Sequence, residues 1–192
     1  MPTGHASGGE NSSHAEVTST TLRKRPTTKR VPFRPRARLL ILLGDQLIRD
    51  SGVAVFELVK NSYDADATEC LVTIHDITQP EIARIIVQDD GEGMTLETIS
   101  EVWLEPGTDY KAMQRASGQR TKTVKRLPLG EKGVGRFAVH KLGQSISLVT
   151  KAARNDEIVV TINWADFEKS KYLKDVPVTI RSRSPEVFQG RA

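Results

Sequence analysis

The segment VFELVKNSYDADA, residues 55–67, constrains the fold more than any other stretch of this chain. Its apolar spacing predicts a helix with one side buried in a core. Glu57, Asn61 and Asp64 follow at spacings of four and three residues, which places them on one helical face. Because a buried carboxylate is costly unless it is paired or bound, that face has to meet a ligand or a charged partner.

Charge divides the chain into a basic tail and a near-neutral remainder. Residues 1–40 hold eight basic and two acidic side chains, and residues 41–192 carry a net charge of −2. Residues 1–36 are polar and rich in Ser, Thr, Gly and Pro, which predicts a disordered tail. Such a tail either stays solvated or contacts nucleic acid without sequence specificity. Residues 37–192 are predicted to form the folded domain.

Membrane and disulfide-rich classes are not expected. No apolar run reaches the roughly 18 residues that a membrane span needs, and the N-terminus has no apolar signal region. Cys70 is the only cysteine, so a disulfide within the chain is impossible. Its apolar neighbours predict a buried, inert thiol. We therefore expect a cytoplasmic protein.

The order of predicted elements favours an α+β fold. A helix over residues 37–48 precedes a second helix capped by Ser51. Thr95 is expected to cap a short helix, and the polar residues 105–129 to form a long loop. We expect a two-layer sandwich, a mixed β-sheet with helices on one face. The remaining predicted elements are strands at 70–77, 82–89, 145–151, 157–163 and 176–182 and a helix at 134–142.

The segment DDGEGM, Asp89–Met94, directly follows a predicted strand. Gly91 and Gly93 permit positive φ and let a ligand approach the backbone. Asp89 can accept a hydrogen bond from an exocyclic amine. Taken alone, the pattern more often means a tight turn.

The segment GEKGVGRF, residues 130–137, directly precedes a predicted helix. Backbone N–H groups at such a helix start can bind phosphate, and Lys132 and Arg136 add positive charge. The spacing matches neither a P-loop nor a dinucleotide fingerprint. Taken alone, a glycine-rich helix entry explains it equally well.

In order and spacing, the three segments together resemble the GHKL ATPase superfamily over residues 39–180. That superfamily has the Bergerat fold and includes gyrase B subunits, heat-shock chaperones, histidine kinases and MutL, with MORC proteins close by. The resemblance implies that ATP and Mg²⁺ are the ligands. By the same resemblance, Asn61 binds the magnesium, Glu57 activates the attacking water and Asp64 orders the pocket. Asp66 lies off that face and is expected at the helix end or the surface.

The resemblance also assigns the base and phosphate contacts. Asp89 accepts the adenine amino group, and residues 105–129 form a basic ATP lid. The remaining nucleotide-binding residues that it implies are Gly91, Gly93, Met94, Lys132, Gly133, Val134, Gly135 and Arg136.

One departure affects the expected activity. The family ends its domain with a Gly-Thr motif, and none follows Ile180, so we expect the domain to be incomplete at its C-terminal end. The expected function is Mg²⁺-dependent ATP hydrolysis, weak or absent in the isolated chain. It would be coupled to conformational change or ATP-dependent homodimerisation of a larger protein. A histidine-kinase catalytic domain and a non-hydrolysing nucleotide switch are the alternatives.

Overall fold

The computed structural model describes residues 28–48, 50–130 and 135–189. The chain divides after Phe33 into two units, and the described helices and strands all belong to the second. Residues 1–27 of the predicted tail lie outside the described residues, as do Lys132, Gly133 and Val134 of the predicted phosphate segment. Within the described part of the chain, no helix is both long and apolar enough to cross a membrane.

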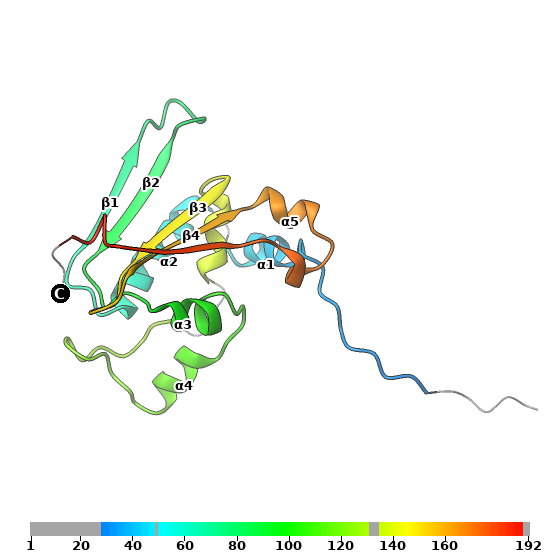
Figure 1. Ribbon diagram of the computed structural model, residues 1–192, viewed down its shortest axis with the longest axis horizontal. Coiled ribbons are helices and arrows are strands. Elements are labelled where there is room, and N and C mark those ends of the chain that lie inside the picture. Colours follow the sequence, from blue (N-terminus) through cyan, green and yellow to red (C-terminus); the bar gives the residue numbers. More distant parts are fainter. Residues whose placement is uncertain (1–27, 49, 131–134, 190–192) are drawn as a thin grey trace, which may run out of the picture. The chain divides into compact units, whose positions relative to one another are not determined.

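Two helices begin the folded unit, α1 (Leu39–Leu47) and α2 (Ser51–Asp64), and both are labelled in Figure 1. The Asp50 carboxylate accepts a hydrogen bond from the Val53 N–H at 3.0 Å and so caps α2. The prediction that Ser51 is the cap was wrong by one position. Asp50 already satisfies a free N–H of the first turn, so Ser51 is helical.

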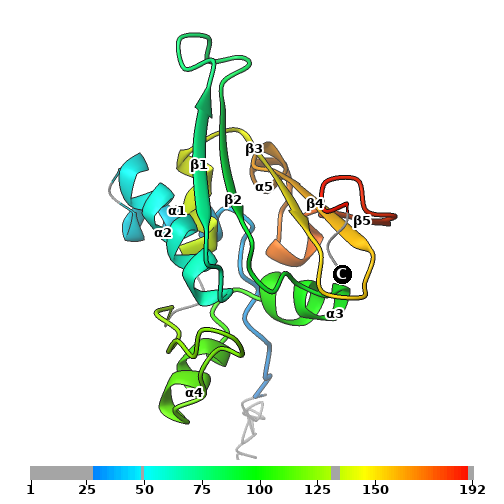
Figure 2. The same cartoon turned by 90° about the vertical axis from the view of Figure 1, so that its left-hand side faces the viewer.

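Strands β1 (Cys70–His75) and β2 (Arg84–Asp89) form an antiparallel hairpin that pairs Cys70 with Asp89. Figures 1 and 2 both show its turn end lying away from the helices. Its apolar side chains therefore stay accessible, as Ile74 does at 54% exposure. Cys70 is exposed as well, so the prediction of a buried thiol was wrong.

Strands β3 (Ser145–Thr150), β4 (Glu157–Asn163) and β5 (Thr179–Arg183) form a second antiparallel sheet in that order. The predicted α+β class is confirmed, but the strands form two antiparallel sheets in place of one mixed sheet. Strands that follow one another directly along the chain fold back and pair antiparallel. Strands β2 and β3, which only a crossover could pair in parallel, are not paired.

The core lies between the second sheet and the helical segments on one of its faces. Ile158, Val160 and Ile162 alternate along β4 and are at most 3% exposed. Around them pack residues of α1, α5 (Ala165–Lys169), the π-helical turn η1 (Ile99–Trp103) and the 3₁₀ helix η2 (Gly135–Lys141). The predicted helices on one sheet face are therefore present.

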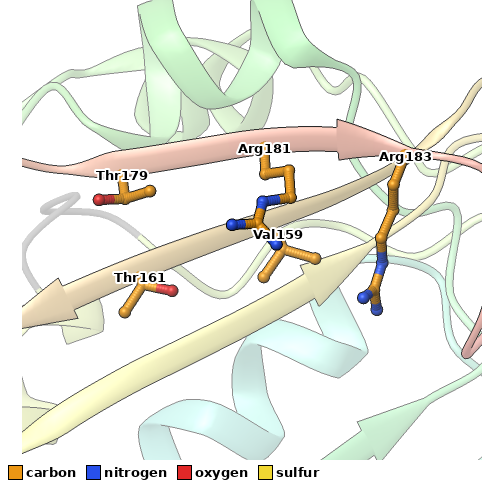
Figure 3. A pocket seen from close by; sticks show the side chains of 5 residues that line it. All are labelled: Val159, Thr161, Thr179, Arg181 and Arg183. Atoms are coloured by element: carbon orange, nitrogen blue, oxygen red, sulfur yellow. The ribbon is translucent and has the colours of Figure 1, made fainter.

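The other face of this sheet is polar. Thr161, Thr179 and Arg181 are exposed on it. Figure 3 shows them with Val159 and Arg183 around a shallow cavity of about 140 Å³. None of these five residues belongs to the predicted nucleotide site, so the cavity is separate from it.

The segment between the two sheets contains more helix than predicted. Thr95 caps α3 (Leu96–Thr98) by accepting the Thr98 N–H at 3.1 Å, which confirms the predicted cap. The predicted loop of residues 105–129 contains helix α4 (Tyr110–Ala116), and Figure 2 shows α4 as a separate helix. A 3₁₀ turn, η3 (Leu173–Asp175), lies between α5 and β5.

A buried carboxylate holds the segment after β5. Glu157 is 0% exposed and lies 2.6 Å from a guanidinium nitrogen of Arg183, its partner across the β4–β5 ladder. Its Oε2 accepts the N–H groups of Glu186, Val187 and Phe188 at 3.3, 2.8 and 3.0 Å. One side chain of β4 therefore organises the backbone of residues 186–188.

Candidate functional site

Helix α2 carries the predicted catalytic and metal-binding residues. Glu57 pairs with Lys60 at 3.0 Å, and a Cβ added to Gly135 would lie only 2.5 Å from Glu57 Oε2. Gly135 of the predicted phosphate segment therefore lies against Glu57, and a side chain at position 135 would require the carboxylate to shift. Asn61 lies one turn further along the same face, as the spacing predicted.

The Asp64 side chain is enclosed, at 2% exposure. It accepts the N–H groups of Leu129 and Gly130 at 2.7 and 3.1 Å. Lys111 Nζ lies 2.7 Å from the same carboxylate and 3.4 Å from Asn61 Oδ1. The buried charge thus has the partners that its burial requires.

Asp89 stands at the end of β2 and is bound to α2. Its Oδ2 accepts a hydrogen bond from Ser62 Oγ at 2.8 Å, and its Oδ1 accepts the Gly91 N–H at 2.9 Å. Ser62 is 3% exposed, and its Oγ also accepts a hydrogen bond from Cys70 Sγ at 3.4 Å. Sequence reasoning missed Ser62, although a small polar residue one turn after the core residue Leu58 was a usable signal.

The two glycines after Asp89 differ in what they permit. Gly91 does not have positive φ, so half of that prediction was wrong. Glycine is required at position 91 for steric reasons, because a Cβ would lie 2.6 Å from the Ala65 carbonyl oxygen. Gly93 has φ +67° and a Cβ there would overlap the Lys151 carbonyl. Met94 packs half-buried against the core, and its N–H donates to Thr150 Oγ1 at 2.9 Å.

We expect Gly93→Ala to destabilise the fold more than Gly107→Ala. Gly107 has φ +80° with nothing within 4 Å of its Cβ position, so alanine there meets only a backbone cost of about 1 kcal/mol. Gly93→Ala adds an overlap with rigid backbone and should cost at least twice as much. Chemical denaturation of both variants measures the difference, and equal costs would show that the Lys151 contact relaxes freely.

Asp66, two residues beyond the last residue of α2, binds the backbone near the end of the predicted lid. It is 6% exposed and accepts the N–H groups of Thr123 and Val124 at 2.6 and 3.2 Å. Burial raises the pKa of this carboxyl, but hydrogen bonds, first of all from the Thr121 side chain, hold the pKa below its ordinary value. Asp66 directly follows the C-cap Ala65, so the expected helix-end position is confirmed, whereas the alternative of a surface residue was wrong because the side chain is buried against another segment.

Arg126 makes a second connection between the lid and α2. Its guanidinium donates to the Ala67 carbonyl at 2.5 Å and lies 4.6 Å from the centroid of the Tyr63 ring. Together with Asp66, this contact fastens residues 121–126 to the C-terminal end of α2. The lid is therefore held at side chains that sequence reasoning had not assigned to the site.

Helix η2 continues the predicted phosphate segment. The prediction of a helix here is right, and its described part, Gly135–Lys141, is a 3₁₀ helix. His140 and Lys141 of η2 lie 3.0 and 3.4 Å from the Asp45 carboxylate of α1. A side-chain hydrogen bond from His140 is the main cause that lowers the pKa of Asp45. The structure does not describe the side chain of Arg136.

The donor set fits a magnesium ion shared with a nucleotide better than an ion held by protein alone. Among residues 28–48, 50–130 and 135–189, no group of three or more His, Cys, Asp or Glu side chains could hold a metal. Magnesium usually takes one or two protein oxygens and completes its shell with water and substrate phosphates. Asn61 Oδ1 already faces a positive charge, the Lys111 ammonium at 3.4 Å, so its surroundings accept a cation.

A comparison with protein families identifies the family of the chain. A family model described as "Histidine kinase-, DNA gyrase B-, and HSP90-like ATPase" matches residues 49–188, which is more than half of the chain. The matched range includes all the candidate site residues. A search of curated proteins finds no match to the chain.

Proposed function

Since the chain belongs to the histidine kinase-, DNA gyrase B- and HSP90-like ATPase family, we propose that it binds ATP with Mg²⁺ and hydrolyses the ATP. ATP binding is the general property of this family. Mg²⁺ use, hydrolysis and the coupling of nucleotide state to conformational change or dimerisation of a larger protein are our proposal. The observation that carries it is the set of contacts that α2 makes with both glycine segments. Glu57 lies against Gly135, and Ser62 holds Asp89.

Two side chains of α2 suit the reaction itself. Glu57 is a carboxylate beside the phosphate segment, positioned as a base that accepts a proton from an attacking water. Its pairing with Lys60 fixes its orientation. Asn61 would hold the magnesium ion, which offsets phosphate charge when it is bound with ATP. Asp64 acts on the loop that covers this face, since it binds the backbone at Leu129 and Gly130.

Asp89 suits recognition of the adenine base. Its Oδ2 accepts a hydrogen bond from Ser62 Oγ and its Oδ1 accepts one from the Gly91 N–H, and a carboxylate oxygen has lone pairs for more than one donor. A carboxylate oxygen can accept a hydrogen bond from the C6 amino group of adenine, whereas guanine has at C6 a carbonyl oxygen, which is itself an acceptor. Ser62 and the Gly91 N–H keep the carboxylate from rotating. A rigid, correctly oriented acceptor is what discrimination between the two bases requires.

Titration of ATP and Mg²⁺ by calorimetry tests the proposal directly. We expect binding by the parent and its loss in Asp89→Asn, at least about a hundredfold weaker, because the amide must present a donor to either Ser62 or the adenine amine. Asp90→Asn is the matched control. Asp90 binds Thr68 and Glu69 on the other side of the strand end, so that variant should bind ATP normally.

Equal affinity in the Asp89 and Asp90 variants would remove the adenine assignment. Absence of binding by the parent itself would overturn the proposed function for this chain.

A non-hydrolysing nucleotide switch is the second candidate. The observation that favours it is the attachment of residues 121–130 to α2 through Asp64, Asp66 and Arg126. A nucleotide that changes those contacts would move the loop whether or not ATP is cleaved. The two candidates differ in the effect of changing Glu57.

A further inference from the structure

Lys111 places a positive charge directly on the proposed metal ligand. It belongs to α4, far from α2 in the sequence, and its ammonium bridges Asp64 and Asn61 at 2.7 and 3.4 Å. The Asp64 side chain is 2% exposed and that of Lys111 is 31% exposed. The pair is therefore better shielded from solvent than an ordinary surface ion pair.

The same carboxylate also binds the far end of the loop. Asp64 accepts the Leu129 and Gly130 N–H groups, and the Lys111 stem passes 2.9 Å from where a Cβ on Gly130 would lie. Helix α4 and the end of the loop are thus held by one side chain of α2. Whatever displaces the ammonium also changes the surroundings of the backbone at Gly130.

We propose that Lys111 is a tethered cation that competes with the divalent metal for Asn61, so that α4 must leave α2 before metal-bound nucleotide is accepted. The inference rests on the proposed function. An ammonium 3.4 Å from Asn61 Oδ1 and a magnesium ion about 2.1 Å from the same oxygen carry like charges at short range, so they repel and compete for that oxygen. Metal binding and the contact of α4 with α2 then oppose each other, and each weakens the other by the same factor.

The opposite role for Lys111 makes the opposite prediction. A lysine that reaches the phosphates of bound ATP would strengthen binding, so its removal would weaken binding. In the structure the ammonium instead contacts the Asp64 carboxylate and the amide oxygen of Asn61, the proposed metal ligand. If Lys111 competes with the metal, removing its charge lowers the Mg²⁺ concentration needed for ATP binding. If Lys111 binds the phosphates, removing its charge raises that concentration.

The test titrates ATP at a series of Mg²⁺ concentrations into the parent, Lys111→Met and Lys111→Arg. We expect Lys111→Met to reach half-maximal binding at about one-fifth of the Mg²⁺ that the parent needs. Lys111→Arg keeps the charge and should need as much Mg²⁺ as the parent. Lys122→Met is the matched control, since Lys122 is 84% exposed in the same loop and pairs only weakly with Glu92 at 3.3 Å.

Hydrogen exchange without nucleotide gives an independent readout. The amides of residues 110–116 should exchange faster in Lys111→Met than in the parent or in Lys122→Met, because the contact with α2 is lost. A higher Mg²⁺ requirement in Lys111→Met would overturn the competition. The competition would also be overturned if Lys111→Met showed the Mg²⁺ dependence and the hydrogen exchange of the parent.

Failure of the proposed function is recognised separately, as absence of ATP binding by the parent. Titration with Mn²⁺ alone then decides the competition. Lys111→Met must bind Mn²⁺ more tightly than Lys122→Met does, and equal Mn²⁺ binding by these two variants rejects the inference.

Discussion

Replacing Glu57 with Gln is expected to lower the rate of ATP hydrolysis by at least about a hundredfold while leaving ATP affinity within about twofold of the parent's. The amide keeps the shape that fits against Gly135 but cannot accept the proton of an attacking water. Because Glu57 is assigned to the reacting water and not to the nucleotide, binding should survive. Phosphate release and calorimetric titration of the same preparations measure the two quantities.

Glu101→Gln is the matched control for this experiment, since Glu101 is an exposed glutamate of η1. It should hydrolyse ATP at the parent's rate. Equal rates in the parent and in Glu57→Gln would rule out Glu57 as the base. A parent that binds ATP but releases no phosphate would favour the nucleotide switch, in which the Glu57 substitution changes little.

Replacing Glu157 with Ala is expected to lower the free energy of unfolding by about 3 kcal/mol. The change removes the buried partner of Arg183 and the carboxylate oxygen that accepts the backbone N–H groups of residues 186–188. The figure lies at the low end for a broken buried ion pair because Arg183 keeps 27% of its side chain exposed. Urea unfolding of the purified chain measures it.

Glu186→Ala isolates the effect of burial. Glu186 pairs with the same arginine at 2.6 Å, but its side chain is 63% exposed. An exposed pair contributes about 0 to 1 kcal/mol, so this variant should unfold almost as the parent does. Similar costs for the two variants would mean that Glu157 acts only as an ordinary surface charge.

Acid should remove the contribution of Glu157. Burial alone would raise the pKa of its carboxyl. Hydrogen bonds from the Phe188 N–H and Arg183 outweigh it and hold the pKa below the ordinary glutamate value. A lowered folded-state pKa means that the stabilisation is complete above the unfolded-state pKa, about 4.3, and is lost as pH falls through the folded-state value. When the pH falls from 5 to below the folded-state pKa of Glu157, the free energy of unfolding should therefore decrease less in Glu157→Gln than in the parent.

The sequence by itself determined the features that depend on a local period. Glu57, Asn61 and Asp64 share a face because a helix repeats every 3.6 residues, whatever surrounds it. The strands were predictable from their alternating and β-branched residues. The motif order was enough to predict the family.

Only the tertiary structure decided which distant groups meet. Ser62 with Asp89, Asp66 with the backbone of Thr123, and Lys111 with Asp64 join residues of different elements, and no periodicity links their positions. The division into two antiparallel sheets and the burial of Glu157 were equally out of reach. Burial and pairing depend on the arrangement of whole elements in space, whereas the spacing of residues along the chain specifies only the face of an element on which a side chain lies.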